Sequence, residues 1–225
     1  MRRTTATILG SLFWILALSA CVNVSRTDSP CIALTLDDGP NPPYTEKFLA
    51  LLDRHRVRAT FFLVGQRIPL YPATVERVIR AGHELGNHSW HHEHLAMARF
   101  SKIAAEVQDT DAAIRNLGYT GPIPFRAPFG TPWGFHTLWL WWNARQNVLY
   151  DIEPIPPDYH RRSPTEIAAS ALQRVRPGSI VLLHDGPGIR SESLEAAALL
   201  LPALREKGFC FTTVGELSDP KAPRL

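Results

Sequence analysis

The sequence predicts an α/β domain with a mostly parallel sheet, and three observations support this. The chain has 225 residues, which suits one sizeable domain and not two. Its apolar content of 45% and charged content of 20% are ordinary for a globular fold. Short apolar runs alternate with stretches of helical spacing, as in strands joined by crossover helices. About seven such strands indicate either a barrel or a doubly wound sheet.

A targeting segment precedes the domain. Arg2 and Arg3 are followed by an apolar run over 8–18 that is too short to span a bilayer as a mature helix. We therefore predict that residues 1–20 are a secretory signal. The small residues before Cys21 resemble a bacterial lipobox, which implies a lipidated Cys21 that anchors the protein to a membrane, facing the periplasm. An ordinary cleaved signal beside a cysteine is the alternative.

Residue Val22 follows this cysteine where an aspartate could stand. By resemblance to sorted lipoproteins of two-membrane bacteria, this favours the outer membrane. Residues 21–30 then form a short tether. Removing residues 1–20 takes away two arginines and no acid, so the formal charge falls from +3 to +1. The basic balance therefore gives no reason to expect a nucleic-acid partner.

The main domain is expected over 31–215, with a loose tail over 216–225. Strands are predicted at 31–36, 59–64, 83–87, 123–126, 147–152, 179–183 and 209–214. Helices are predicted at 44–54, 72–81, 101–116, 135–145, 164–175 and 193–207. Pro164 suits a helix start, and Gly208 suits a helix stop. The proline-rich segment 151–164 is expected to be a loop.

Two cysteines lie beyond Cys21, one at each end of the domain. Cys31 opens the first predicted strand and Cys210 lies in the last. Export would place both in an oxidising compartment, and closure of the sheet would make their strands neighbours. A disulfide is then possible, and two buried thiols that act as small apolar residues are the alternative.

Polar strings follow the predicted strands, where parallel sheets carry their functional residues. Asp37 and Asp38 end the first strand in TLDDGP. A turn explains this string without chemistry. However, when two adjacent carboxylates point in different directions, one can bind a metal while the other faces the substrate.

The string HSWHH places His88 and His92 four residues apart. Such a pair can converge on one metal, and with a nearby aspartate it leaves metal positions open for water and substrate. His91 and His94 offer other pairings, and a histidine-rich loop that binds metals casually is the plain alternative.

Two further strings supply an arginine and a late histidine. Arg126 opens RAPFG at a strand end and could hold a carboxylate ionised by a forked hydrogen bond. The Pro-Phe-Gly backbone after it could face an oxyanion. His184 ends the most apolar strand, IVLLHD, where a general-acid role is attractive beside an open metal site.

Together these strings resemble the polysaccharide deacetylase family, also called the NodB-type family or carbohydrate esterase family four. The resemblance spans about 31–215 and covers the first, second, third and fifth family motifs. It implies a single deformed (β/α) barrel, a divalent metal that is commonly zinc, and removal of acetyl groups from N-acetylated sugars. The expected substrates are peptidoglycan, then poly-N-acetylglucosamine-like polysaccharide and chitin oligomers.

By this resemblance, Asp37 matches the general base and Arg126 the residue that positions it. Three residues match the metal ligands: Asp38, His88 and His92. His184 matches the general acid, which protonates the leaving amine.

The substrate side of the site is carried over in the same way. The backbone N–H of Phe129 matches the oxyanion donor, and Leu182 matches one wall of the acetyl pocket. The fourth motif departs from the family pattern of an aspartate and a tryptophan. Asp158-Tyr159 is the best match, with Asp151 as competitor, and tyrosine in place of tryptophan changes the pocket wall.

Two rival functions stay open at this stage. Related barrels remove formyl groups or open cyclic amides, and the pocket wall would discriminate them. A lipid-anchored glycan-binding protein without catalysis is the other, although base, ligands and acid are all present in the sequence.

Overall fold

The core of the protein is a five-stranded sheet in which every paired strand is parallel. The computed structural model describes residues 21–22, 30–154, 157–158 and 163–218. The sheet runs in the order β4-β3-β2-β6, and β7 also pairs with β2. Its strands are β2 (Cys31–Gly39), β3 (Thr60–Leu63), β4 (Glu84–Asn87), β6 (Ile180–His184) and β7 (Cys210–Thr212).

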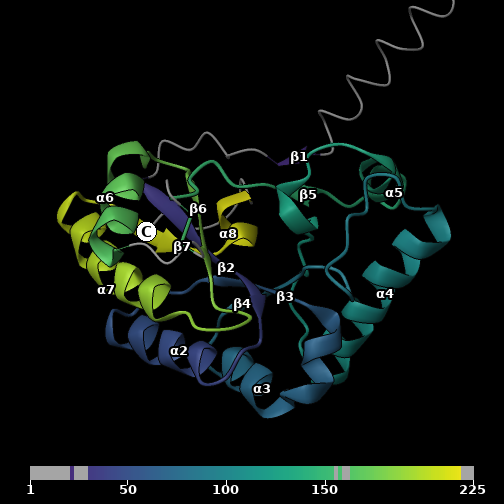
Figure 1. Cartoon of the computed structure of the whole chain (residues 1–225), viewed down its shortest axis with the longest axis horizontal. Coiled ribbons are helices and arrows are strands. Elements are labelled where there is room, and N and C mark those ends of the chain that lie inside the picture. The colour runs from purple at the N-terminus through teal and green to yellow at the C-terminus, as the bar shows by residue number, and fades with distance from the viewer. Residues whose placement is uncertain (1–20, 23–29, 155–156, 159–162, 219–225) are drawn as a thin grey trace, which may run out of the picture.

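Helices surround this sheet, and most follow a strand along the chain. They are α2 (Tyr44–Arg54), α3 (Pro72–Arg80), α4 (Phe100–Asn116), α5 (Phe135–Trp142), α6 (Pro164–Arg174), α7 (Ser191–Glu206) and α8 (Val214–Ser218), with the 3₁₀ turns η1 (Gly65–Leu70) and η2 (Pro128–Gly130). Figure 1 shows α6 and α7 on one side of the strands, α2 and α3 below them, and α4 and α5 on the other side.

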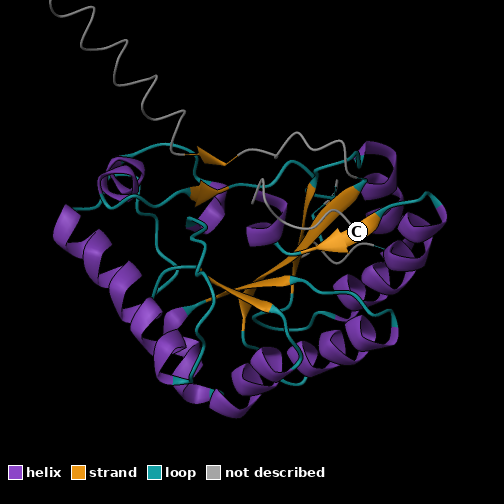
Figure 2. Cartoon of the chain, turned by 180° about the vertical axis from the view of Figure 1, so that it is seen from behind, coloured by secondary structure: helices purple, strands orange, loops and turns teal. Residues whose placement is uncertain are grey.

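The sheet closes on itself through single-residue bridges. Asn87 at the end of β4 bridges Phe125, which in turn bridges Asn147 at the start of β5 (Asn147–Val148). The chain then crosses to β6, where Ile152 bridges Val181. The predicted deformed barrel is therefore confirmed, with one well-paired side and one loosely paired side, as Figure 2 shows from behind.

The loosely paired side corrects two predicted strands. Of 123–126, only Phe125 makes a bridge. Its neighbour Pro124 has no N–H to donate to a ladder, although its carbonyl accepts the Asn87 N–H at 2.8 Å. The predicted strand 147–152 is paired only at its two ends. Asn147 bridges Phe125 and Ile152 bridges Val181 of β6, and the chain between them crosses from one of these neighbours to the other.

Side chains alternate between the barrel interior and the helix layer. On β2, Leu34 and Leu36 belong to the large apolar cluster shared with the helices. Thr35 and Asp37 point the other way, toward Arg126 inside the barrel. The same period of two brings the polar residues of the strand ends into one space.

The first and last strands of the sheet are covalently joined. Cys31 pairs in register with Cys210, and the two form a disulfide with a Cα–Cα distance of 4.2 Å. The alternative of two free thiols is therefore wrong.

One short strand lies where the tether was predicted. β1 (Cys21–Val22) pairs in parallel with β5. Across the part of the chain that the structure describes, no helix has both the length and the apolar character needed to cross a bilayer.

Candidate active site

The two adjacent carboxylates separate because β2 bulges at its end. The pairing with β3 passes from Asp37 opposite Phe62 directly to Gly39 opposite Leu63, so Asp38 is an extra residue. Its φ of 74° lies in the left-handed region, which residues other than glycine rarely adopt. Asp37 therefore continues into the barrel, while Asp38 turns toward the histidine loop.

Asp38 meets two imidazole rings at the mouth of the barrel. Its Oδ1 atom lies 3.4 Å from His88 Nε2 and 3.1 Å from His92 Nε2. One ligand atom from each of these three residues lies within 4.8 Å of the others. The structure thus brings the predicted ligand set together.

The donor atoms of this cluster fit a divalent metal. His88 Nδ1 lies 2.9 Å from the carbonyl oxygen of Arg126, which can only accept, so Nδ1 carries the proton. In the neutral ring, Nε2 then turns a lone pair toward the carboxylate of Asp38. The buried Oδ1 atom of Asp38 has no hydrogen-bond partner among the described residues. A cation between these atoms would satisfy them, and a histidine that binds a metal usually donates its other ring N–H to a carbonyl or carboxylate, as His88 does to the Arg126 carbonyl.

The charge state of Asp38 suits the same use. Burial raises the pKa of this carboxyl, but its interactions with His88 and His92 outweigh burial and hold the pKa well below its usual range. The carboxylate is therefore ionised throughout the pH range of ordinary enzymes.

The histidine loop is held in place by Glu106, which sequence reasoning missed. This buried carboxylate of α4 accepts the backbone N–H groups of Trp90 and His91 at 2.9 and 2.8 Å. It also lies 2.6 Å from His91 Nδ1. Burial raises the pKa of Glu106, but these bonds and the charge of Lys102 lower it overall. His91 is thus occupied beside Glu106, away from the Asp38 cluster.

We expect Glu106→Ala to lower the free energy of unfolding by about 1–3 kcal/mol, because the backbone N–H groups of Trp90 and His91 lose their acceptor. Looser placement of His88 and His92 should also weaken metal binding by roughly 10–100-fold. Denaturant unfolding and a zinc titration measure the two effects. Glu93→Gln is the matched control, because Glu93 is exposed and contacts Lys102. Equal results for both variants would contradict a positioning role for Glu106.

Asp37 is fixed by a buried arginine. Arg126 is fully buried, and its Nη1 atom donates to Asp37 Oδ1 at 2.6 Å and to Thr35 Oγ1 at 2.8 Å. The guanidinium also lies 4.1 Å above the ring of Phe62. One carboxylate oxygen is held by the arginine, and Oδ2 lies on the metal-ligand side, 3.7 Å from His88 Nε2.

The late histidine pairs with Asp158, not with its competitor. His184 Nδ1 lies 2.7 Å from Asp158 Oδ1, and the His184 backbone N–H donates to Oδ2 at 2.7 Å. Asp151 instead accepts the Ile180 N–H and the Ser179 hydroxyl at the start of β6. Burial lowers the pKa of His184, but Asp158 outweighs it, and with Asp37 and Asp38 it raises the pKa to about 9.

A further buried carboxylate, Asp185, braces the loop after β2. Its Oδ2 atom accepts the Thr45 hydroxyl, and its backbone carbonyl accepts Asn41 Nδ2 at 3.0 Å. A Cβ on Gly39 would lie 2.7 Å from this carboxylate, so only glycine fits there. Burial raises the pKa of Asp185 to about 7. In sequence, this residue looked only like the end of the IVLLHD string.

The remaining predicted residues differ in how the structure places them. Phe129 adopts a left-handed φ of 62° in η2, and its ring lies 4.7 Å from that of His92. His94 stacks on the same phenyl ring, with ring centroids 3.9 Å apart. Leu182 is buried in β6 opposite Thr35. Tyr159 lies outside the described residues.

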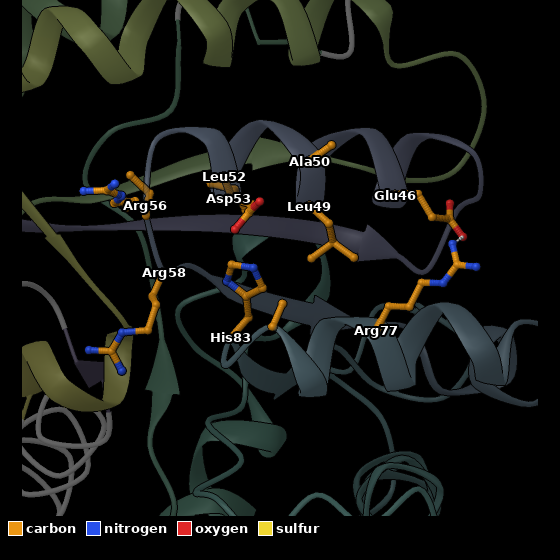
Figure 3. A pocket seen from close by; sticks show the side chains of 11 residues that line it. Glu46, Leu49, Ala50, Leu52, Asp53, Arg56, Arg58, Arg77 and His83 are labelled. Carbon is orange, nitrogen blue, oxygen red and sulfur yellow. Dashed lines mark ion pairs between the residues drawn. The ribbon is translucent and has the colours of Figure 1, made fainter.

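A separate hollow of about 680 Å³ lies outside the sheet between α2 and α3 (Figure 3). Its lining includes the Glu46–Arg77 ion pair and His83. Burial and the charge of Arg58 lower the pKa of His83 to about 4, so this imidazole is neutral. The hollow shares no residue with the Asp38 cluster.

Comparison with known proteins gives the same assignment as this geometry. The sequence model described as "Polysaccharide deacetylase" matches residues 25–140. The chain belongs to the polysaccharide deacetylase family. It is 34% identical over 190 residues to a peptidoglycan-N-acetylglucosamine deacetylase of Bacillus cereus, covering 83% of this chain and 87% of the relative.

Two further relatives of this polysaccharide deacetylase agree. A chitooligosaccharide deacetylase of Sinorhizobium fredii is 34% identical over 197 residues, covering 82% of this chain and 90% of the relative. A crystal structure of a peptidoglycan N-acetylglucosamine deacetylase with 4-naphthalen-1-yl-N-oxidanyl-benzamide superposes with a TM-score of 0.84 and 28% identity, covering 91% of this chain and 95% of the other.

Proposed function

We propose that this polysaccharide deacetylase is a metal-dependent hydrolase that removes N-acetyl groups from the sugars of a cell-envelope or extracellular glycan. One observation carries the proposal. A three-residue metal-ligand cluster adjoins an aspartate held by a buried arginine, and the residue opposite this aspartate on β6 is a histidine held by a buried aspartate. That arrangement supplies a base on one side of an amide and an acid on the other.

Asp37 acts as the general base. Arg126 donates to its Oδ1 atom and holds the carboxylate in place, while the second oxygen takes the proton of the attacking water. The fixed guanidinium also sets the direction from which this proton is taken. In this proposal, the backbone N–H of Phe129 faces the oxyanion that develops on the carbonyl oxygen.

His184 acts as the general acid. A pKa of about 9 keeps its imidazole protonated at neutral pH, so a proton is available for the leaving amine. Asp158 accepts from Nδ1, which leaves the other ring nitrogen to donate. Leu182 and Tyr159 are proposed as walls of the acetyl pocket.

Asp38, His88 and His92 would hold the metal, for which zinc is our proposal because two imidazoles and one carboxylate suit it. When bound, such an ion polarises the amide carbonyl and lowers the pKa of water. Peptidoglycan is the first substrate candidate, since a relative is named for it; chitin oligomers and poly-N-acetylglucosamine follow.

The test is acetate release from these three glycans by the full chain, with and without added zinc. We expect release from at least one polymer, lost on treatment with a chelator and restored by zinc. Formate release instead of acetate would move the assignment to a related amide hydrolase. Silence on all three glycans, in folded and metal-loaded protein, would contradict the proposal.

A separate variant tests the acid. Replacing Asp158 with asparagine removes the charge that raises the His184 pKa, so this pKa should fall from about 9 toward or below 6.5. His184 is protonated below its pKa, so the alkaline limb of the pH–kcat profile should move to lower pH by about two units. Asp151→Asn is the matched control, and an unmoved limb in Asp158→Asn would argue against His184 as the acid.

We propose further that the protein is exported and anchored through a lipid on Cys21, facing the periplasm from the outer membrane. The basic start, the apolar run over 8–18 and the small residues before Cys21 support this. Mass spectrometry of the mature N-terminus in cells tests it. A diacylglyceryl adduct on Cys21, absent in Cys21→Ser, is expected; an unmodified N-terminus at another residue would contradict it.

A further inference from the structure

Six large apolar side chains are exposed on two neighbouring segments, 97–100 and 133–142, and none of them belongs to the active site described above. We call this the aromatic surface, and it consists of Met97, Phe100, Trp133, Phe135, Trp141 and Trp142. Their exposed fractions run from 42% for Phe135 to 77% for Trp142. Single exposed apolar residues are ordinary, but a cluster of this size marks an interaction site.

The two segments that carry the aromatic surface pack against each other. The Phe135 N–H donates to the carbonyl of Ala96 at 2.7 Å, which fixes the start of α5 against the loop before α4. The rings of Phe100 and Phe135 meet edge to face at 6.2 Å. Gly134 packs so closely on Ala96 that a Cβ there would lie 2.5 Å away.

Helix α5 is apolar on its outer side as well as its inner side. His136, Thr137 and Leu140 are buried against the domain. Phe135, Leu138 and Trp142 follow helical spacing on the other side, where a surface helix of a soluble domain would carry polar residues. The outer side of α5 therefore exposes apolar area that binding to a partner or a lipid surface would bury.

The segment that carries α5 adds no negative charge to this surface. No aspartate or glutamate occurs between Asp111 and Asp151 in the sequence. Anionic headgroups would therefore meet no carboxylate from this stretch of chain.

The described N-terminal strand enters the fold beside the same helix. β1 pairs with β5, which begins five residues after α5 ends. Figure 1 shows β1 and β5 side by side at the edge of the molecule that also carries α5. Cys21 in β1 directly follows the segment predicted to target the chain to a membrane.

We propose that the aromatic surface docks the domain onto the lipid bilayer at which the N-terminal segment places it. Tryptophan rings prefer the membrane–water interface, and Trp133, Trp141 and Trp142 would lie at headgroup depth. The anchor and the surface together would fix how the domain sits on the membrane. The inference rests on the membrane targeting proposed above and needs no particular glycan substrate.

Tryptophan quenching by brominated lipid tests the proposal in the full chain. The background variant is Trp14→Phe, which removes the tryptophan of the apolar run. It is bound to vesicles of phosphatidylethanolamine and phosphatidylglycerol, with or without shallow-brominated phosphatidylcholine. We expect a roughly twofold fall in tryptophan emission with brominated lipid, because interfacial tryptophans lie at the depth of the bromines.

Two double variants decide which residues are responsible. Trp141→Gln/Trp142→Gln should lose most of the quenching. Leu70→Gln/Ile189→Gln makes the same kind of change at residues 65% and 64% exposed outside the aromatic surface, and should quench as before. Unfolding midpoints check that all variants are folded.

The outcomes separate docking from anchoring and from other partners. Flotation of the chain with vesicles but no quenching in the Trp14→Phe background would keep the anchor and overturn the docking. Emission that responds to a chitin tetramer and not to lipid would assign the surface to glycan and overturn the proposal. The proposal would also be overturned if analytical sedimentation showed a dimer that dissociates in the tryptophan variants, together with no quenching by lipid.

Discussion

Replacing Asp37 with asparagine should abolish almost all acetate release while the metal stays bound. The amide keeps the size of the side chain, and its oxygen can still accept from Arg126, which holds Oδ1 at 2.6 Å. It cannot take a proton from water, so kcat should fall by at least about 100-fold, the usual contribution of a general base. Acetate release and a zinc titration on the same preparation measure both effects.

This prediction separates the base from the ligands. Asp38, not Asp37, is the proposed metal ligand, so Asp37→Asn should leave zinc stoichiometry and affinity near those of the wild type. Thr35→Val is a useful comparison, because it removes the hydrogen bond from Arg126 to the Thr35 hydroxyl and leaves the Asp37 carboxylate unchanged. Full activity in Asp37→Asn would show that another group takes the proton.

The second large effect concerns the metal. His88→Ala removes a proposed ligand that is 2% exposed and whose Nε2 atom lies 3.4 Å from Asp38 Oδ1. Loss of an outer-shell partner already weakens metal sites by 10–100-fold, so loss of this ligand should cost more than about 100-fold in zinc affinity. Activity should fall with it, and added zinc should no longer raise the thermal midpoint. Calorimetric zinc titration and thermal unfolding measure these effects.

His91→Ala is the matched control for this change. His91 belongs to the same loop, but its Nδ1 atom faces Glu106 at 2.6 Å. We expect this variant to keep its metal and most of its activity. Normal metal content in His88→Ala together with loss in His91→Ala or His94→Ala would assign the ligands differently.

The sequence predicted the site best where a reactive side chain lies at the end of a predicted strand. Asp37, Asp38 and His88 follow predicted strands and Arg126 ends one, and parallel strands bring their carboxyl ends together. That placement is why a barrel of these strands collects the strings at one end. The six predicted helices also lie within a few residues of α2 to α7.

Other features depend on contacts that no local pattern records. Glu106 looks like an ordinary residue of an amphipathic helix, yet it holds the loop of His91 from a distance of 15 residues. The sequence could not decide between Asp158 and Asp151, because a proline-rich loop has no periodicity from which the direction of a side chain could be predicted. At Phe125, a run that resembles a strand lost its ladder because proline precedes it.

The bond between Cys31 and Cys210 makes the domain, in topological terms, a ring of chain. It closes a sequence separation of 179 residues, for which the loop-entropy estimate of stabilisation is roughly 5 kcal/mol. A single protease cut within the ring leaves both fragments covalently attached and every sheet contact available. A nicked domain in an oxidising compartment should therefore remain one molecule and separate into two pieces only after reduction.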